Sequence, residues 1–263
     1  MPHHAALSRL VDAELQYAKF NAVRTAIDCD ANIELEGNDS FASICDPSRP
    51  ASCYYNRAVC KNASSLDLTS LDLLPSSTRG VEVPPSSLTE QGSKRLLELG
   101  FRPAYALCYL TIDPKRAPVI ADAFTESGRS VSRLGHDQTD EFFDLLQIEG
   151  VDFSPEKRER KRRFYCTEQF VTFVGKDEAG KSCAWATLHL NSGIGYLGNA
   201  FTLPSHRGCG FQAALLGARL QHAKATGASI VYSDVEHESQ SHKNCERAGM
   251  RTVTINTIWS KDA

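Results

Sequence analysis

The stretch AFTLPSHRGCGFQAALL (residues 200–216) decides the fold, because it joins a strand to a helix through a short glycine-rich turn. Residues 200–203 end a strand, and Pro204 closes it because proline cannot donate a hydrogen bond to a sheet. A helix over 211–223 follows, since its leucines are spaced to form one buried face. The stretch therefore predicts a strand–turn–helix unit.

The turn between these two elements, Arg207-Gly208-Cys209-Gly210, has the composition of an anion-binding loop. A helix N-terminus presents unpaired N–H groups and the positive end of the helix dipole. Glycines let the backbone approach a ligand closely, and arginine adds a permanent charge. We predict that the turn holds the pyrophosphate of a coenzyme A-type donor. The alternative is a tight turn whose glycines serve only geometry, because short glycine motifs also occur by chance.

Length and composition describe an ordinary globular protein. The chain has 263 residues, 41% of them hydrophobic, and a net charge of −3. This is enough for one large domain or two smaller ones, and the absence of a basic excess argues against nucleic acid as a partner. No apolar run reaches the ~20 residues that span a bilayer, and the N-terminus does not resemble a secretory signal. We expect a cytoplasmic protein without a membrane partner.

The nine cysteines are many for a cytoplasmic protein. They form no CxxC pair and no zinc-site spacing, so no metal site is expected. Reduced, apolar packing residues are the simplest interpretation. Cys209 and Cys245 are the two that fall within the expected site.

The expected elements divide the chain near 113–130, a segment with two prolines and a glycine. The first part is expected to hold a helix over 5–27, polar turns over 37–52, strands over 53–60, 80–83 and 101–112, and a helix capped by Ser86 or Ser87 that ends at Leu99. The second part is expected to hold strands over 130–134, 168–175, 182–190, 194–203, 228–235 and 250–259, and helices over 137–148, from Pro155, over 211–223 and over 239–248. LLELGFRPAY (96–105) and CERAGMRTVT (245–254) form a weak internal repeat, which suggests two related lobes.

The second part resembles the GNAT superfamily of acyl-coenzyme A-dependent N-acyltransferases. LPSHRGCGFQAALL resembles the acyl-CoA loop Q/R-x-x-G-x-G/A, although Ser205 stands where Gln or Arg is usual. SHKNCERAGMR (241–251) is similar to the SQRNxERxGF segment of tandem bacterial GNAT proteins, and CYYNRAV (53–59) to the NRV segment of their N-terminal lobes. The implied fold is an α/β protein with a mixed α+β sheet and two tandem lobes, a degenerate one over 1–125 and an acyl-CoA-binding one over 130–263.

The resemblance also implies a donor site for acetyl-CoA or another acyl-CoA. The strand end would run beside the pantetheine arm, the turn and first helical residues would give N–H groups to the pyrophosphate, and Asn244 would face the pantetheine or serve as a helix-end amide. These donor-binding candidates are Ala200, Phe201, Thr202, Arg207, Gly208, Cys209, Gly210, Phe211, Gln212 and Asn244.

The implied reaction moves an acetyl or other acyl group from coenzyme A to the amine of a small molecule, by direct attack on the thioester. Asp234 and Glu236 share one face of a strand by alternation, so either could take the proton of the amine, or both could be solvated loop-end carboxylates. Cys245 stands where many GNAT enzymes have a tyrosine acid. Its thiol could donate a proton or only pack.

Two alternatives stay open. The basic run KRERKRR (157–163) could attract an acyl carrier protein, whose phosphopantetheine would replace free coenzyme A, or it could be a solvated helix face. The missing tyrosine and the degenerate first lobe would also suit a sensor that binds acyl-CoA without transferring the acyl group.

Overall fold

The computed structural model describes residues 2–26, 33–37, 40–61, 66, 68–117, 122–151 and 154–261. Its α-helices are α1 (Pro2–Thr25), α2 (Leu68–Asp72), α3 (Glu90–Glu98), α4 (Asp122–Glu126), α5 (Thr139–Ile148), α6 (Pro155–Lys161), α7 (Phe211–Ala225) and α8 (Gln240–Arg247). Its strands are β1 (Glu34–Gly37), β2 (Phe41–Cys45), β3 (Arg57–Cys60), β4 (Gly80–Val83), β5 (Arg102–Ile112), β6 (Ser130–Arg133), β7 (Phe170–Lys176), β8 (Ser182–Asn191), β9 (Ile194–Thr202), β10 (Ile230–Glu236) and β11 (Arg251–Ser260).

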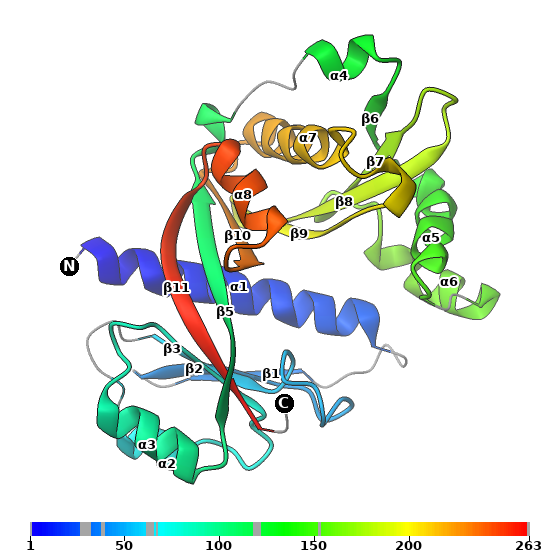
Figure 1. Cartoon of the computed structure of the whole chain (residues 1–263). Coiled ribbons are helices and arrows are strands. Elements are labelled where there is room, and N and C mark those ends of the chain that lie inside the picture. The colour runs from blue at the N-terminus through cyan, green and yellow to red at the C-terminus, as the bar shows by residue number, and fades with distance from the viewer. Residues whose placement is uncertain are drawn as a thin grey trace. The chain divides into compact units, whose positions relative to one another are not determined.

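These strands form one mixed sheet in the order β1-β2-β3-β4-β11-β5-β10-β9-β8-β7-β6 (Figure 1). The sheet contains both parallel and antiparallel strand pairs, and helices lie between the strands along the chain. The predicted mixed α/β class is therefore confirmed. The chain divides into two compact units: unit 1 holds Met1–Tyr109, Asp234–Ser239 and Thr252–Ala263, and unit 2 holds Leu110–Ser233 and Gln240–Arg251. The division into two lobes at 1–125 and 130–263, which rests on the sequence, stays a prediction.

Unit 1 places different kinds of side chain on the two faces of its strands. Val81 and Val83 of β4 join an apolar core with Leu71 of α2 and Leu96 of α3. Alternation along the strand sends the intervening Glu82 to the opposite face, where it is buried at 1% exposure. This face therefore carries charged groups inside the fold.

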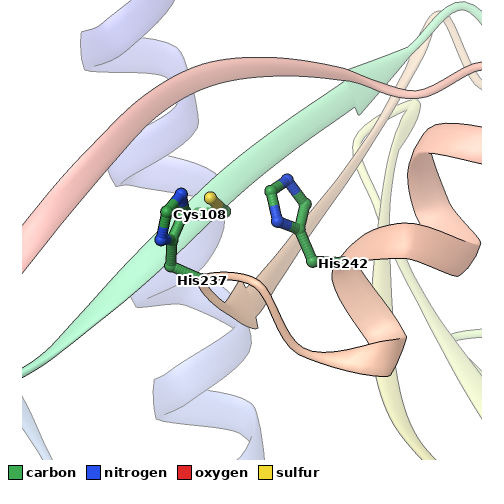
Figure 2. A group of neighbouring side chains, drawn as sticks. All are labelled: Cys108, His237 and His242. Atoms are coloured by element: carbon green, nitrogen blue, oxygen red, sulfur yellow. The ribbon is translucent and has the colours of Figure 1, made fainter.

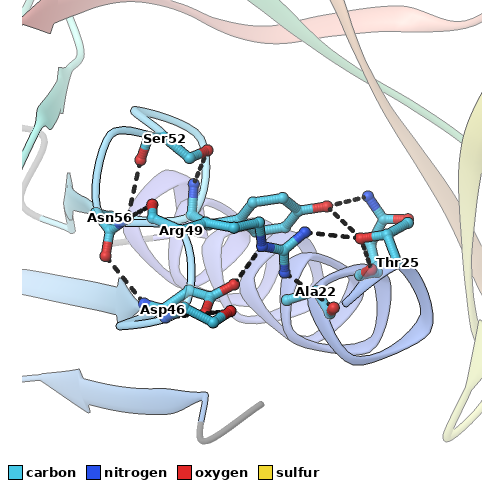
Figure 3. A network of polar contacts seen from close by, with 9 residues as sticks. Ala22, Thr25, Asp46, Arg49, Ser52 and Asn56 are labelled. Carbon is cyan, nitrogen blue, oxygen red and sulfur yellow. Dashed lines mark hydrogen bonds and ion pairs between the residues drawn. The ribbon is translucent and has the colours of Figure 1, made fainter. Parts of the chain in front are cut away.

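A polar network fastens the loop before β3 to the end of α1 (Figure 3). Arg49 Nε lies 2.5 Å from Asp46 Oδ2, and its other nitrogens donate to Thr25 Oγ1 at 2.8 Å and to the Ala22 carbonyl at 2.9 Å. The same guanidinium stacks 3.6 Å above the ring of Tyr55. The Ala22 carbonyl in the last turn of α1 also accepts from the Ala26 N–H at 2.9 Å, so Arg49 adds a second donor there and ties the loop to the helix end.

Unit 2 is built on the antiparallel strands β6, β7, β8 and β9, with β10 parallel to β9. Its aromatic core includes Phe142 and Phe143 of α5, whose rings lie 5.7 and 5.1 Å from the ring of Tyr165, while Phe142 also lies 5.2 Å from Trp185. Ser154 caps α6 and Pro155 takes its first position, as the sequence predicts. The described part of the chain has no helix long and apolar enough to cross a bilayer.

The internal repeat predicted from sequence has the same local geometry in both copies. After α3, Phe101 N donates to Leu96 O at 2.9 Å and Gly100 has a φ of 89°. After α8, Met250 N donates to Cys245 O at 3.1 Å and Gly249 has a φ of 82°. Both helices thus end in a left-handed glycine that turns the chain into a long strand, which is the geometry of a Schellman cap.

Three sequence expectations for the first part need correction. Residues 41–45, expected within a polar turn segment, form β2, because Phe41, Ala42 and Ile44 are buried. The strand expected over 53–60 begins only at Arg57. The helix expected to start at Ser86 or Ser87 starts at Glu90, because Thr89 accepts a hydrogen bond from the backbone N–H of Gly92 and so acts as the N-cap.

Candidate functional site

The turn before α7 in unit 2 has the backbone of an anion-binding loop. Gly208 and Gly210 have φ values of 78° and 87°, which other residues rarely adopt. The first backbone bond of the helix runs from Ala214 N to Gly210 O at 3.1 Å, and no side chain caps the helix. The N–H groups of the first turn are therefore left for a ligand.

Side chains outside the predicted motif hold this turn in place. Arg129 donates to the Cys209 carbonyl at 2.9 Å and pairs with Glu178 at 2.6 Å. Phe211, the first residue of α7, packs so tightly on Gly175 that a Cβ there would meet its ring at 2.7 Å. Arg129 and Gly175 were not predicted as part of the site, since neither lies near the motif in the sequence.

The predicted donor-binding residues of the strand end lie next to the turn. Arg207 Nε lies 3.3 Å from the Thr202 carbonyl, and the Gln212 amide donates to Thr202 Oγ1 at 2.8 Å. Thr202 is buried, whereas Ala200 and Arg207 are exposed and Phe201 is half-buried. Thr202 thus links the strand, the charged side chain and the helix start.

The strand β9 contains a bulge before this end. Ala186 of β8 pairs with Ala200, but Leu188 pairs with Leu197, so β9 has one extra residue between these pairs. The parallel pairing of β9 with β10 ends at Tyr196, opposite Tyr232. Beyond Tyr196, β9 therefore keeps its β8 partner and loses its β10 partner, so β9 and β10 diverge there.

A buried arginine of α7 supports the bulge. Arg219 is 4% exposed and lies among the apolar positions of the helix. It donates to the carbonyl of Thr187 at 3.2 Å and lies 3.4 Å from that of Gly198. This guanidinium therefore supplies donors to carbonyl groups of both strands at the bulge. An arginine on the apolar face of a helix was a signal that sequence reasoning overlooked.

The remaining predicted site residues fall on β10 and α8. Asp234 is half-buried and Glu236 exposed, both at the end of β10 that belongs to unit 1. Cys245 is 6% exposed in α8 of unit 2. Asn244 accepts from Gln240 at 3.0 Å and lies 3.5 Å from Arg247, so its amide oxygen is engaged within its own helix.

A buried charged cluster lies on the polar face of unit 1. Arg57 bonds to Glu14 of α1, and its Nε lies 3.7 Å from Glu82. Asn256 of β11 donates to Glu82 at 2.8 Å. Burial raises the pKa of the Glu82 carboxyl, and the nearby charge of Asp234 raises it further, while Arg57 acts in the opposite direction. Asp234 is therefore near enough to this cluster, with its two glutamates and one arginine, to affect the pKa of Glu82.

Tyrosine rings surround the same cluster. Tyr109 forms a hydrogen bond with Glu82, and the guanidinium of Arg57 lies 4.4 Å from the ring centre of Tyr54. Burial raises the pKa of both the Tyr54 and the Tyr109 hydroxyl well above the ordinary value, with Asp234 among the further causes. Both phenols are therefore neutral at physiological pH and can act as hydrogen-bond donors.

Cys108 of β5 and His237, which follows β10, are near one another in unit 1 (Figure 2). Cys108 Sγ and a ring nitrogen of His237 lie within 4.8 Å, and the His237 N–H donates to the Ala106 carbonyl at 2.9 Å. A structural zinc site takes four protein ligands, so these two side chains do not make one. His242, also drawn in Figure 2, belongs to α8 of unit 2.

Two arginines of the basic run over 157–163 are paired with acidic side chains within unit 2. Arg158 lies 2.6 Å from Asp144, and Arg162 lies 2.9 Å from Asp140. Hydrogen bonds to Asp140 from Arg162, and more weakly from Arg158, hold the pKa of its carboxyl below the usual range. The pairs join α6 to α5, so the run serves partly to pack two helices against each other.

Comparison with known proteins gives a family match to part of the chain. Residues 137–250 match the model of the acetyltransferase (GNAT) family, so this segment is a GNAT domain. No protein with a curated description matches the chain significantly.

Solved structures share the fold over more of the chain. A GCN5-related N-acetyltransferase from Kribbella flavida matches with a TM-score of 0.67 at 13% identity, over 97% of this chain and 95% of its own. A protein of unknown function from Staphylococcus epidermidis matches with a TM-score of 0.58 at 10% identity, over 92% and 100%. A tandem GNAT protein from the clavulanic acid biosynthesis pathway matches with a TM-score of 0.53 at 13% identity, over 84% and 78%. At these identities the likeness shows the fold alone.

Proposed function

We propose that the chain is an N-acyltransferase that moves an acetyl or other acyl group from coenzyme A to the amine of a small molecule. The neutral amine nitrogen attacks the thioester carbonyl, a C–N bond forms, and the C–S bond breaks. A base accepts the proton that the amine loses, and the departing sulfur takes up a proton. The protein contributes orientation, stabilisation of the oxyanion and the proton acceptor.

The observation that carries the proposal is the combination of an open strand edge with an uncapped helix start in unit 2. Beyond Tyr196 the β10-facing edge of β9 can bond the amide groups of pantetheine, in the manner of an added strand. The strand then leads through Thr202 to the glycine turn, whose free N–H groups suit a pyrophosphate. A ligand that is an amide chain at one end and a diphosphate at the other fits this order.

Asp234 is the proposed proton acceptor. It follows Tyr232 by two residues on β10, just beyond the last parallel pair with β9. Its acidic and aromatic surroundings in unit 1 favour a cationic acceptor, because carboxylates and tyrosine rings both attract an ammonium group. Cys245 is the proposed proton donor for the leaving sulfur. It is buried, and burial favours the neutral thiol, which is the form that can donate a proton.

Free coenzyme A is the proposed donor in preference to an acyl carrier protein. The ion pairs of Arg158 and Arg162 with α5 leave less positive charge on the basic run for an acidic partner. The sensor alternative rests on Cys245, which is buried where many family members have a tyrosine acid.

The decisive test measures thiol release and acylated product by mass spectrometry with acetyl-CoA and a panel of small amines. We expect turnover with at least one amine, and Asp234→Asn to lower kcat/KM by about 10²-fold or more because a general base is lost. Glu236→Gln is the matched control, since this exposed carboxylate lies on the same strand. Tight acetyl-CoA binding without turnover, with either free or carrier-bound donors, would instead identify a sensor.

A further inference from the structure

Unit 2 contains an open pocket of about 700 Å³ that the proposed reaction does not use. Its lining comes from two segments, 133–136 after β6 and 163–168 before β7. The polar side chains that matter for its chemistry are Arg133, His136, Arg163, Thr167 and Glu168. Two arginines and one glutamate give the pocket lining a net positive charge.

The pocket lies at the end of β7 opposite to the glycine turn. Phe211 packs on Gly175, near the last residue of β7, and so places the start of α7 at that end. Thr167 and Glu168 precede Phe170, the first residue of the same strand. The seven residues of β7 extend about 20 Å at ~3.3 Å per residue. A ligand in this pocket is therefore separate from one bound at the turn.

The two arginines are available to a ligand for different reasons. Arg133 lies 2.5 Å from Glu168, but the Glu168 side chain is 81% exposed, so water screens the pair and an incoming anion can replace the carboxylate. Arg163 is exposed and lies 4.8 Å from the centre of the Phe164 ring. Among the described residues it has no carboxylate partner. An incoming anion would thus meet one free guanidinium and one weakly held guanidinium.

Backbone geometry adds a hydroxyl donor to these charges. Thr167 Oγ1 accepts from the Phe170 N–H at 2.9 Å, which leaves the hydroxyl proton free to donate. The preceding residue, Cys166, has a φ of 52°, a left-handed conformation that costs free energy for any residue with a Cβ. His136 is oriented by a 3.2 Å contact between Nδ1 and the Tyr165 carbonyl. Strained backbone of this kind clusters at ligand sites.

We propose that this pocket is a second ligand site, for a small molecule that carries a phosphate or carboxylate group. Guanidinium groups bind such oxyanions through paired, charge-assisted hydrogen bonds, and the Thr167 hydroxyl supplies a further donor. The proposal does not depend on acyl transfer, because no donor-binding residue contributes to the pocket.

The test is calorimetric titration of the full chain with inorganic phosphate and, separately, with succinate. We expect one saturable site, and Arg163→Gln to weaken it about tenfold, the loss of one charge-assisted hydrogen bond. Arg160→Gln is the matched control: it removes an exposed arginine from the same basic run, but Arg160 does not line the pocket. Binding of phosphate alone would define a phosphate site, and binding of both probes a general oxyanion site.

A second variant separates this pocket from the glycine turn. In Arg207→Glu the pocket keeps all of its residues, so we expect phosphate or succinate to bind as before. Loss of binding in Arg207→Glu with retention in Arg163→Gln would overturn the proposal, as would an equal loss in Arg160→Gln or no saturable binding of either probe. Thermal unfolding of each variant checks that the exposed substitutions leave the fold intact.

Discussion

The guanidinium of Arg219 lies 3.4 Å from the carbonyl oxygen of Gly198, at the bulge of β9. This relationship joins α7, whose start forms the glycine turn, to the point where β9 and β10 diverge. The helix therefore stabilises both ends of the proposed donor site, through its N-terminal N–H groups and through one buried side chain. The same guanidinium donates to the Thr187 carbonyl of β8 at 3.2 Å, so one side chain contacts both strands at the bulge.

Arg219→Met should lower the free energy of unfolding by about 2–4 kcal/mol, since it leaves buried carbonyl groups without a donor. It should also weaken acetyl-CoA binding, because the backbone of the bulge is no longer held. Urea denaturation and calorimetry measure the two effects. Lys224→Met, an exposed change on the same helix, should alter neither. Normal stability in Arg219→Met would show that the bulge does not need the arginine.

Gly208→Ala tests the turn before α7 against a matched glycine, Gly227, just after the same helix. Gly208 and Gly227 have φ values of 78° and 79°, and a Cβ at either would meet nothing within 4 Å. Both alanine variants should therefore lose about 1–2 kcal/mol of stability from backbone strain alone. Only Gly208→Ala should weaken acetyl-CoA binding, as measured by calorimetry. Equal affinities in the two variants would contradict the assignment of the turn to the pyrophosphate.

Charge reversal at Arg207 tests the same assignment electrostatically. Arg207→Glu should weaken acetyl-CoA binding by about 10- to 100-fold, because an attraction to the pyrophosphate becomes a repulsion. Arg160→Glu makes the same change of charge at an exposed position of α6 and should have little effect. Calorimetric affinities of the two variants at equal ionic strength decide the matter. Unchanged affinity in Arg207→Glu would rule out this arginine as a pyrophosphate ligand.

The order of helices and strands could be predicted because hydrophobic spacing and turn residues are local signals. The glycine turn at Gly208 and Gly210 is the clearest case, since its positive φ values follow from residue type. The bulge of β9 could not be predicted, because one extra residue in a ladder becomes visible only against the partner strand. Arg219 carried a weak local signal as a charged residue on an apolar helix face.

The charged cluster of unit 1 was beyond sequence reasoning for a different reason. Glu14, Arg57 and Glu82 come from α1, β3 and β4, so only tertiary packing brings them together. β2 was missed because polar residues surround a short run whose burial depends on its neighbours in the sheet. Long-range packing overrides local propensity at such positions.

Thiol chemistry should distinguish two cysteines near the turn. Burial raises the pKa of the Cys183 thiol to about 11, so at pH 8 only about one molecule in 10³ carries the thiolate there. Cys209 is half-buried within the turn itself. Iodoacetamide should therefore modify Cys209 faster than Cys183, and acetyl-CoA should protect Cys209. Mass spectrometry of digests with and without acetyl-CoA measures both rates, with Cys209→Ser as the control. Labelling of Cys209 that acetyl-CoA does not slow would contradict the site.

Glu82→Gln tests the cluster of unit 1 through the pH dependence of stability. Burial raises the pKa of Glu82, so the folded chain holds a proton that the unfolded chain releases, and the free energy of unfolding falls as pH rises from the ordinary value of 4.5 through the folded one. The glutamine variant cannot ionise, so it should lose this decline and gain stability relative to the native chain as pH rises.

The measurement is urea denaturation of both proteins across that pH range. Glu178→Gln is the control with the opposite sign, because hydrogen bonds from its own backbone N–H and from Arg129 lower the pKa of the exposed Glu178 carboxyl. Glu178→Gln should therefore be slightly less stable than the native chain at pH values above the ordinary Glu pKa, whereas Glu82→Gln should gain stability there. A constant difference between Glu82→Gln and the native chain at every pH would mean that Glu82 ionises as easily in the folded state as in the unfolded one. That result would contradict the raised pKa of the Glu82 carboxyl in the folded chain.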